Sequence, residues 1–199
     1  MLGEIIDALF FPPNFRNPGR TLKRMEKRWG QLRRLTVHCQ HHTTERSWIL
    51  VQANFDSDGD AHSLGVHTVV ERRGGTLADG EFAWTWAHQA AKERGAECQL
   101  EEHFMAAARS GNTVEEFDRQ LAKLEKFTRR KVTSLGLYAT SEERGLDEFF
   151  ILKAYVSPLP GAMHPGLCSI AAFDLSRREE LRSLASQLAA RRQITVFES

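Results

Sequence analysis

The chain has 199 residues, of which 41% are hydrophobic and 27% charged, and its formal net charge is +1. These values are typical of a globular protein and exclude a disordered chain, and no apolar run approaches the ~20 residues of a membrane-spanning helix. Glu4 and Asp7 interrupt the apolar residues at the start of the chain, so we expect no secretion signal there.

The three cysteines, Cys39, Cys98 and Cys168, lie far apart and form no Cys-x-x-Cys pair. An odd number of isolated cysteines argues against a disulfide framework and against a structural zinc site. We therefore expect a cytoplasmic protein and predict neither a metal nor a cofactor.

Positive charge is concentrated at the N-terminus. Residues 1–34 contain eight basic and three acidic residues, a net charge of +5, whereas the remainder of the chain has a net charge of −4. A basic segment on a mildly acidic body favours an anionic partner or the acidic face of another protein.

Two helices are predicted in this basic segment. The apolar spacing of residues 2–11 predicts the first, and Pro12 ends it. Residues 21–32 form the second, with Leu22, Met25, Trp29 and Leu32 on one face. We treat residues 1–32 as a basic amphipathic helical arm, and residues 33–199 as the body.

The body alternates strands and helices. Alternating apolar residues and turn signals predict strands over residues 34–41, 48–55, 64–72, 96–100, 132–140, 149–156, 167–173 and 194–197. Helices are predicted over residues 80–94, capped by Asp79 and stopped by Gly95, over 101–109, over 112–130 and over 176–192. The last two begin at the capping-box pairs Asn112/Glu115 and Ser176/Glu179.

The predicted fold class is α+β. We expect an antiparallel sheet, or two, built from two similar ββ-β-α-β halves (residues 33–100 and 132–199), which the helices of residues 101–130 join. Leu35 and Leu137 begin comparable hairpins, and residues 48–50 and 65–69 correspond to 150–152 and 166–170, at offsets of 102, 102 and 101 residues. This pattern leaves both an ancestral duplication and coincidence open.

The order of elements resembles that of small secretion chaperones and of profilin-like scaffolds. The resemblance concerns topology, no motif accompanies it, and it implies a fold rather than a function.

The densest group of potential metal ligands surrounds Cys39. His38 and His42 share one face of the predicted strand, and His62 or His67 could supply a third imidazole across the sheet. The alternative is a polar sheet face that runs into a turn, and we favour it.

Other patterns fit known chemistry poorly. The acidic loop of residues 56–60 lacks the spacing of a calcium-binding loop, and residues 72–75 (Arg-Arg-Gly-Gly) could hold a phosphate but are not followed by a Walker motif. Trp84 and His88, four residues apart on one helix, are a candidate ligand pocket or part of a core helix. Because no nucleophile or zinc-protease motif is present, no catalytic residue is predicted and we favour a non-enzymatic protein.

The arm is the most informative feature for function. It could bind nucleic-acid phosphates, lie on an anionic membrane surface, or dock on a protein; alternatively, its apolar stripe packs on its own body and its charges are only solvated. Our leading hypothesis is an adaptor, chaperone or regulator that binds another protein or a second copy of itself. A nucleic-acid-binding protein and a small-molecule or metal-dependent enzyme are the alternatives. The predicted partner-binding residues are Phe10, Phe11, Phe15, Arg20, Lys23, Arg24, Lys27, Arg28 and Trp29.

Overall fold

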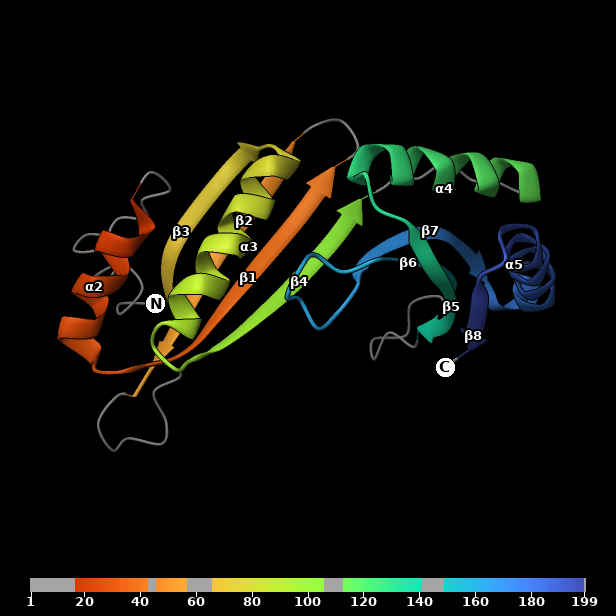
Figure 1. The fold of residues 1–199 in the computed structure, drawn as a ribbon. Helices are drawn as coiled ribbons and strands as arrows, with labels where there is room; N and C mark the ends of the chain where they lie inside the picture. The colour runs from red at the N-terminus through yellow and green to blue at the C-terminus, as the bar shows by residue number, and fades with distance from the viewer. Residues whose placement is uncertain (1–16, 43–45, 57–65, 106–112, 141–148, 199) are drawn as a thin grey trace. The chain divides into compact units, whose positions relative to one another are not determined.

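The computed structural model describes residues 17–42, 46–56, 66–105, 113–140 and 149–198 (Figure 1). These residues form four α-helices and eight strands, which confirms the α+β class. The chain divides into two compact units: unit 1 comprises the described residues up to Glu102 together with Pro160–His164, and unit 2 comprises the rest. None of the helices in these ranges is long and apolar enough to span a membrane.

Unit 1 is a four-stranded sheet with helices on one face. Its strands are hydrogen-bonded in the order β3-β2-β1-β4, and β2 pairs antiparallel with both β1 and β3. Helix α3 lies over this sheet, with α2 beside it (Figure 1). The elements are α2 (Pro18–Trp29), β1 (Leu32–His42), β2 (Ser47–Phe55), β3 (Val66–Gly75), α3 (Leu77–Lys92) and β4 (Glu97–Met105).

The core of unit 1 follows from two periodicities. Along β2 every second residue from Ser47 to Phe55 is buried, as the alternating pattern predicts for a strand with one covered face. The buried face of α3 is mainly alanine, at positions 83, 87, 90 and 91. Small side chains let the helix approach the sheet closely, so the larger side chains of the strands fill the layer between them.

Unit 2 has the same order of elements. Its strand order is β7-β6-β5-β8, and β6 pairs antiparallel with both β5 and β7. The elements are α4 (Val114–Thr128), β5 (Val132–Thr140), β6 (Phe149–Val156), β7 (Gly166–Asp174), a short 3-10 turn (Leu175–Arg177), α5 (Arg178–Arg192) and β8 (Thr195–Glu198).

The pairing of the strands is mixed, so the prediction of a purely antiparallel sheet is wrong. Strand β8 runs parallel to β5, and the last residues of β4, His103–Met105, run parallel to β7. Helix α5 connects β7 to β8. A helical crossover of this kind carries the chain back along the sheet, so the next strand can pair in the parallel direction.

The helix predicted over residues 101–109 is also wrong, because β4 continues to Met105. Leu100 and Phe104 are buried, and the residues on either side of each are more exposed, which is the pattern of a strand. Glu102 occupies the inward position between them and is itself buried. Because Glu102 is charged, the sequence does not show the alternation of apolar residues that would predict a strand here.

Local signals account for the helix ends. Helix α2 begins with Pro18 at its first position, after Asn17 accepts a hydrogen bond from the Arg20 amide, and Gly30, with φ +85°, ends it. It therefore begins and ends about one turn earlier than predicted. Thr76 caps α3 and forms a capping box with Asp79, so Asp79 lies within the helix instead of at its cap.

The two predicted capping boxes of the C-terminal half are not formed as expected. Thr113 caps α4 by accepting a hydrogen bond from the Glu116 amide, and Asn112 lies outside the described residues. A 3-10 turn precedes α5, which has no side-chain cap. The helix predicted over residues 2–11 and the loop of residues 57–60 also lie outside the described ranges.

An aromatic cluster covers a glycine on the sheet of unit 2. A Cβ atom added to Gly136 would lie 2.8 Å from Tyr138, 2.9 Å from Tyr155 and 3.0 Å from Phe197, so the three rings meet over the bare backbone. The Tyr138 and Tyr155 hydroxyls are hydrogen-bonded to each other, and Lys153 lies 4.8 Å from the centre of the Tyr138 ring. Burial and this hydrogen bond raise the pKa of the Tyr155 phenol.

We predict that Gly136→Ala lowers the free energy of unfolding by about 1–3 kcal/mol, because the added methyl group displaces packed rings. Urea unfolding followed by circular dichroism measures the change. Ser134→Ala, two residues earlier on the same strand, is the control and should change stability by less than about 0.5 kcal/mol. Equal stability of Gly136→Ala and the wild type would show that the rings move aside without cost.

Candidate functional site

Helix α2 separates its apolar and basic residues completely. Pro18, Thr21, Leu22 and Met25 are buried in unit 1, with Leu22 and Met25 at most 1% exposed. Five basic residues, which we call the basic face, are exposed to solvent: Arg20, Lys23, Arg24, Lys27 and Arg28. The helix is therefore held by its own body while its charges point outward.

The one acidic residue of α2 is turned toward α3. Glu26 accepts hydrogen bonds from Arg94, with the Nε–Oε1 distance 2.6 Å and the Nη2–Oε2 distance 3.4 Å. Arg94 also donates from Nη1 to the Ala90 carbonyl at 3.0 Å, which fixes the guanidinium at the end of α3. Both side chains are mostly buried. Glu26 is thus neutralised by Arg94, and the basic face of α2 contains no acid.

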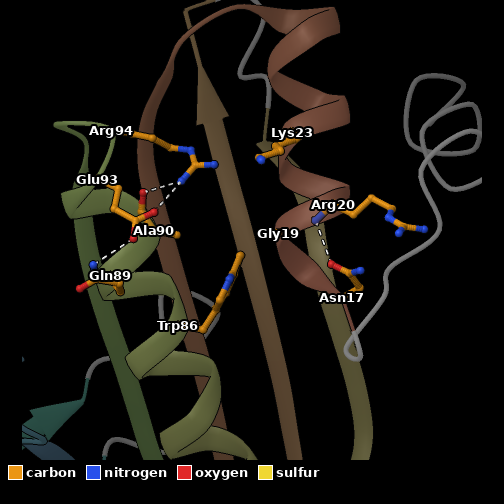
Figure 2. A pocket seen from close by; sticks show the side chains of 9 residues that line it. All are labelled: Asn17, Gly19, Arg20, Lys23, Trp86, Gln89, Ala90, Glu93 and Arg94. Carbon is orange, nitrogen blue, oxygen red and sulfur yellow. Dashed lines mark hydrogen bonds and ion pairs between the residues drawn. The ribbon is translucent and has the colours of Figure 1, made fainter.

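A groove of about 510 Å³ lies between α2 and α3 (Figure 2). Its volume is within the range of small-ligand sites. Trp86 projects from α3 toward α2, and Lys23 extends across from the other side, whereas the guanidinium of Arg20 points away from Trp86 (Figure 2). The lining residues are Asn17, Gly19, Arg20, Lys23, Trp86, Gln89, Ala90, Glu93 and Arg94.

Gly19 keeps the groove open. A Cβ atom added to Gly19 would lie 3.9 Å from the indole nitrogen of Trp86 and would make only ordinary van der Waals contact. A longer side chain at this position would therefore extend into the space between the helices. At this point of the groove, the indole edge of Trp86 therefore lies beside a position that has no side chain.

In unit 2 the corresponding helices, α4 and α5, are joined by additional ion pairs. Arg192, near the end of α5, pairs with Glu125 of α4 at 3.0 Å, as Arg94 pairs with Glu26. Seven residues before Glu125 stands Asp118, which pairs with Arg192 at 2.5 Å and with Arg191 at 3.3 Å. Seven residues before Glu26 stands Gly19, so the carboxylate that bridges α4 and α5 has no counterpart between α2 and α3.

Trp29 anchors the end of α2. Its ring stacks on His67 with centroids 3.9 Å apart and lies 6.0 Å from Phe55, and the Arg28 guanidinium lies 5.2 Å from the ring centre. Trp29 is half-buried in this arrangement. The other aromatic residues predicted to bind a partner, Phe10, Phe11 and Phe15, lie outside the described residues.

Trp84 and His88 contact the Pro160–His164 segment. Trp84 is 3% exposed, and its Nε1 donates a hydrogen bond to the Pro160 carbonyl at 3.0 Å. The His88 ring lies 5.1 Å from that of Trp84, and a Cβ atom on Gly161, where φ is +79°, would lie 3.0 Å from the His88 Nε2. The Pro160–His164 segment of unit 1 therefore lies against Trp84 and His88, the residues predicted to line a ligand pocket.

The histidines considered as metal ligands are dispersed. His38 contacts Glu101 at 2.9 Å and Gln52 at 3.0 Å on the uncovered face of the sheet. His67 stacks on Trp29, which places it on the helix-covered face. No group of three or more His, Cys, Asp or Glu side chains is placed to hold a metal ion within the ranges that the structure describes.

A buried polar group was not predicted from the sequence. His41 Nδ1 lies 2.7 Å from the Ser47 hydroxyl, and its Nε2 lies 3.5 Å from a carboxylate oxygen of Glu102. All three residues are at most 4% exposed, and the nitrogens have the reverse roles of those in a serine hydrolase, where Nε2 faces the serine. We interpret the group as structural. The only sequence signal was Glu102 at an inward position of a strand.

The cysteines show no sign of activation. Cys39, Cys98 and Cys168 are free thiols, and Cys39 and Cys168 are buried. Burial raises the pKa of the Cys98 thiol to about 11, so it is protonated at neutral pH. A nucleophilic cysteine needs the opposite shift.

Comparison of this chain with family models, with curated proteins and with solved structures finds no match. The groove and the basic face of α2 therefore have to be interpreted from their own geometry.

We predict that Glu26→Gln and Glu125→Gln each lower the free energy of unfolding by about 1–2 kcal/mol, because each removes a charged partner from a mostly buried arginine. The loss should be the smaller one in Glu125→Gln, since Arg192 keeps its pair with Asp118. The melting temperature should fall by about 2–8 °C in each variant, and differential scanning fluorimetry measures it.

Glu115→Gln is the matched control. Glu115 also pairs with an arginine, Arg191, at 3.3 Å, but its side chain is 68% exposed. An exposed pair contributes little, so this variant should lose less than about 0.5 kcal/mol. If all three variants melted alike, the helix-fastening role of Arg94 and Arg192 would be wrong.

Proposed function

We propose that this chain is a non-enzymatic protein-interaction module, an adaptor, chaperone or regulator, whose basic face binds an acidic segment of a partner protein. The observation that carries the proposal is the contrast between two helices. Helix α2 has five exposed basic residues and one acid that is paired inward, whereas α4, in the same place in unit 2, has three basic and four acidic residues. Helix α4 of unit 2 thus carries charges of both signs, whereas the exposed charges of α2 in unit 1 are all basic.

The basic face is rigid before it binds. Leu22 and Met25 fix α2 to the sheet, and the Arg94–Glu26 pair fixes it to α3. Because α2 is already folded, binding requires no ordering of this helix and loses less conformational entropy. Substitutions on the basic face should consequently change binding without changing the fold.

The size of the basic face favours a short acidic peptide segment over a duplex nucleic acid. Twelve residues of α2 extend over ~18 Å, a span in which duplex DNA presents about ten phosphates. Glu93, which is exposed on the loop after α3, lines the groove beside α2. Its carboxylate would repel a long polyanion that extended beyond α2.

The arrangement of α2 also argues against a membrane surface. A helix that lies in a bilayer interface inserts its apolar face, but Leu22 and Met25 are already buried in unit 1. The side chains of α2 that remain for a partner are mainly charged, together with the half-buried Trp29 and the groove beside the helix.

We also infer that the two units derive from duplication of one α-βββ-α-β module. Two irregularities of their ladders correspond: β1 and β5 each carry a register shift after their first paired residue, Leu32 and Val132, and β2 and β6 carry one after Val51 and Leu152. A further shift, between Ser47 and Trp48, occurs in unit 1 alone. Bulges are retained within families, so two shared bulges at offsets of 100 and 101 residues support common descent.

Hydrogen bonds outside the ladders support the same inference. After α3 the amide of Ala96 donates a hydrogen bond to the carbonyl of Ala91. After α5 the amide of Ile194 donates one to the carbonyl of Ala189, so donor and acceptor both lie 98 residues later in unit 2. The Arg94–Glu26 and Arg192–Glu125 pairs also correspond. An experimental structure in which the bulges of the two units fell at different positions would contradict the duplication.

The interaction proposal is tested by reversing four charges of the basic face together, with Lys23→Glu, Arg24→Glu, Lys27→Glu and Arg28→Glu in one variant. Binding to labelled acidic peptides, measured by fluorescence anisotropy, should weaken by more than about tenfold, because like charges set against each other cost several kcal/mol. The melting temperature should stay within about 3 °C of the wild type, since exposed charges contribute little to stability.

The matched control reverses four exposed basic residues in unit 2: Arg119, Lys123, Lys126 and Arg129. The net charge changes equally, so equal weakening in both variants would show that binding depends on overall charge alone. Neutral and basic peptides, duplex DNA and vesicles containing phosphatidylserine complete the set. Tighter binding of DNA or vesicles than of any acidic peptide would overturn the proposal, as would a lack of preference for acidic peptides.

A further inference from the structure

We infer that the groove between α2 and α3 receives an aromatic side chain of the acidic partner segment, with a neighbouring carboxylate held by Lys23. This inference rests on the proposed function and identifies the place where the partner is recognised specifically. The basic face alone would attract any acidic segment, because charge at a surface steers association without selecting one sequence.

The wall of the groove suits an aromatic ring. Trp86 is only half-buried and presents its indole to the space beside α2 (Figure 2). Aromatic rings pack on one another in offset or tilted arrangements, and tryptophan is frequent among the residues that dominate binding energy. Ala90 forms an apolar part of the lining next to it, so a ring that entered would meet hydrocarbon as well as the indole.

The charges at the groove suit an acid next to that ring. Lys23 extends toward the groove from α2 (Figure 2), and Arg94 lies at the same end with its charge compensated by Glu26. Glu93 also lines the groove, and its carboxylate accepts a hydrogen bond from Gln89 at 3.0 Å. Among the described residues that line the groove, Lys23 is therefore the cation best placed for a partner carboxylate. Glu93, which lies beside Arg94 across the groove, would repel a second acid.

Unit 2 has different side chains at the two positions that shape the groove. Eight residues before Arg94 stands Trp86, and eight residues before Arg192 stands Leu184, an aliphatic residue that offers no flat ring for stacking. On the other helix Asp118 stands in the place of Gly19 and pairs with both Arg191 and Arg192. Unit 1 thus differs from unit 2 by an aromatic wall on one helix and by a missing side chain on the other.

This difference supplies a variant that closes the groove. Gly19→Asp introduces the carboxylate that unit 2 has, on the side of α2 where the Cβ atom lies nearest to Trp86. The Cβ atom of the new side chain makes only ordinary van der Waals contact, since its nearest heavy atom is the Trp86 Nε1 at 3.9 Å. An acid in the first turn of a helix is favourable, so the melting temperature should not fall. Gly19→Ala is the control, since a methyl group leaves most of the groove open.

The test compares two peptides, an acidic peptide with one central phenylalanine and the same peptide with alanine in its place. With the wild-type protein and with Gly19→Ala, we expect the phenylalanine to strengthen binding at least about tenfold. With Gly19→Asp the two peptides should bind alike, because the ring has no place to enter; such coupling isolates the contact from general charge effects.

The Trp86 indole supplies a second readout. The chain has four tryptophans, and the indole signal of Trp86 in a ¹⁵N–¹H spectrum is assigned as the one that is lost in Trp86→Phe. Addition of the phenylalanine peptide should shift this signal more than that of Trp48, which lies on β2 away from the groove lining.

The outcomes separate the inference from the proposed function. If acidic peptides bind and charge reversal of the basic face abolishes binding, but the phenylalanine contributes equally to wild type and Gly19→Asp, the function stands and the groove is not the recognition site. If acidic peptides show no preference over neutral ones, the proposed function fails and this inference fails with it.

Discussion

In each unit, an arginine near the end of the helix that covers the sheet fastens the helix that precedes the sheet. Arg94 and Arg192 are mostly buried, and each one bonds to a glutamate of the preceding helix. A guanidinium offers several donors in one plane, so one side chain can hold a carboxylate and a backbone carbonyl together. The glutamate faces inward to reach it, and the pair thus holds each helix in the same rotation that burial of its apolar residues favours.

The same fastening leaves the two helix pairs free to differ. In unit 2 a second acid, Asp118, joins the arginine pair and draws α4 and α5 together through a network of charges. In unit 1 a glycine takes the place of that acid and a tryptophan the place of a leucine, and a groove remains. The groove in unit 1 is lined by side chains that differ from those at the corresponding positions of unit 2. Gly19 and Trp86 are particular to unit 1, and they are the physical basis of the function proposed for α2 and α3.

The sequence predicted all eight strands and four described helices, because their periodicities are strong and their ends are marked by glycine and proline. It failed where a single buried polar residue contradicted the pattern: Glu102 made a strand resemble a polar helix. Parallel pairing of β8 with β5 was not predicted, because the residues of a short strand do not specify the direction of their neighbour. The basic residues of α2 were identified, but the groove was not. It depends on Gly19 and Trp86, which lie far apart in the chain and carry no signal until α2 is placed beside α3.

Unit 1 is discontinuous along the chain, and this limits how the protein can be divided. The carbonyl that accepts the Trp84 indole hydrogen belongs to Pro160, and the glycine against His88 is Gly161. A fragment that stopped after β4 would contain every helix and strand of unit 1 and would still lack this segment. Its indole donor would be left without the protein acceptor, and an unsatisfied buried donor costs about 1–3 kcal/mol. An expression fragment of unit 1 that ends at β4 would therefore need a substitution at Trp84, or a tether that restores residues 160–164.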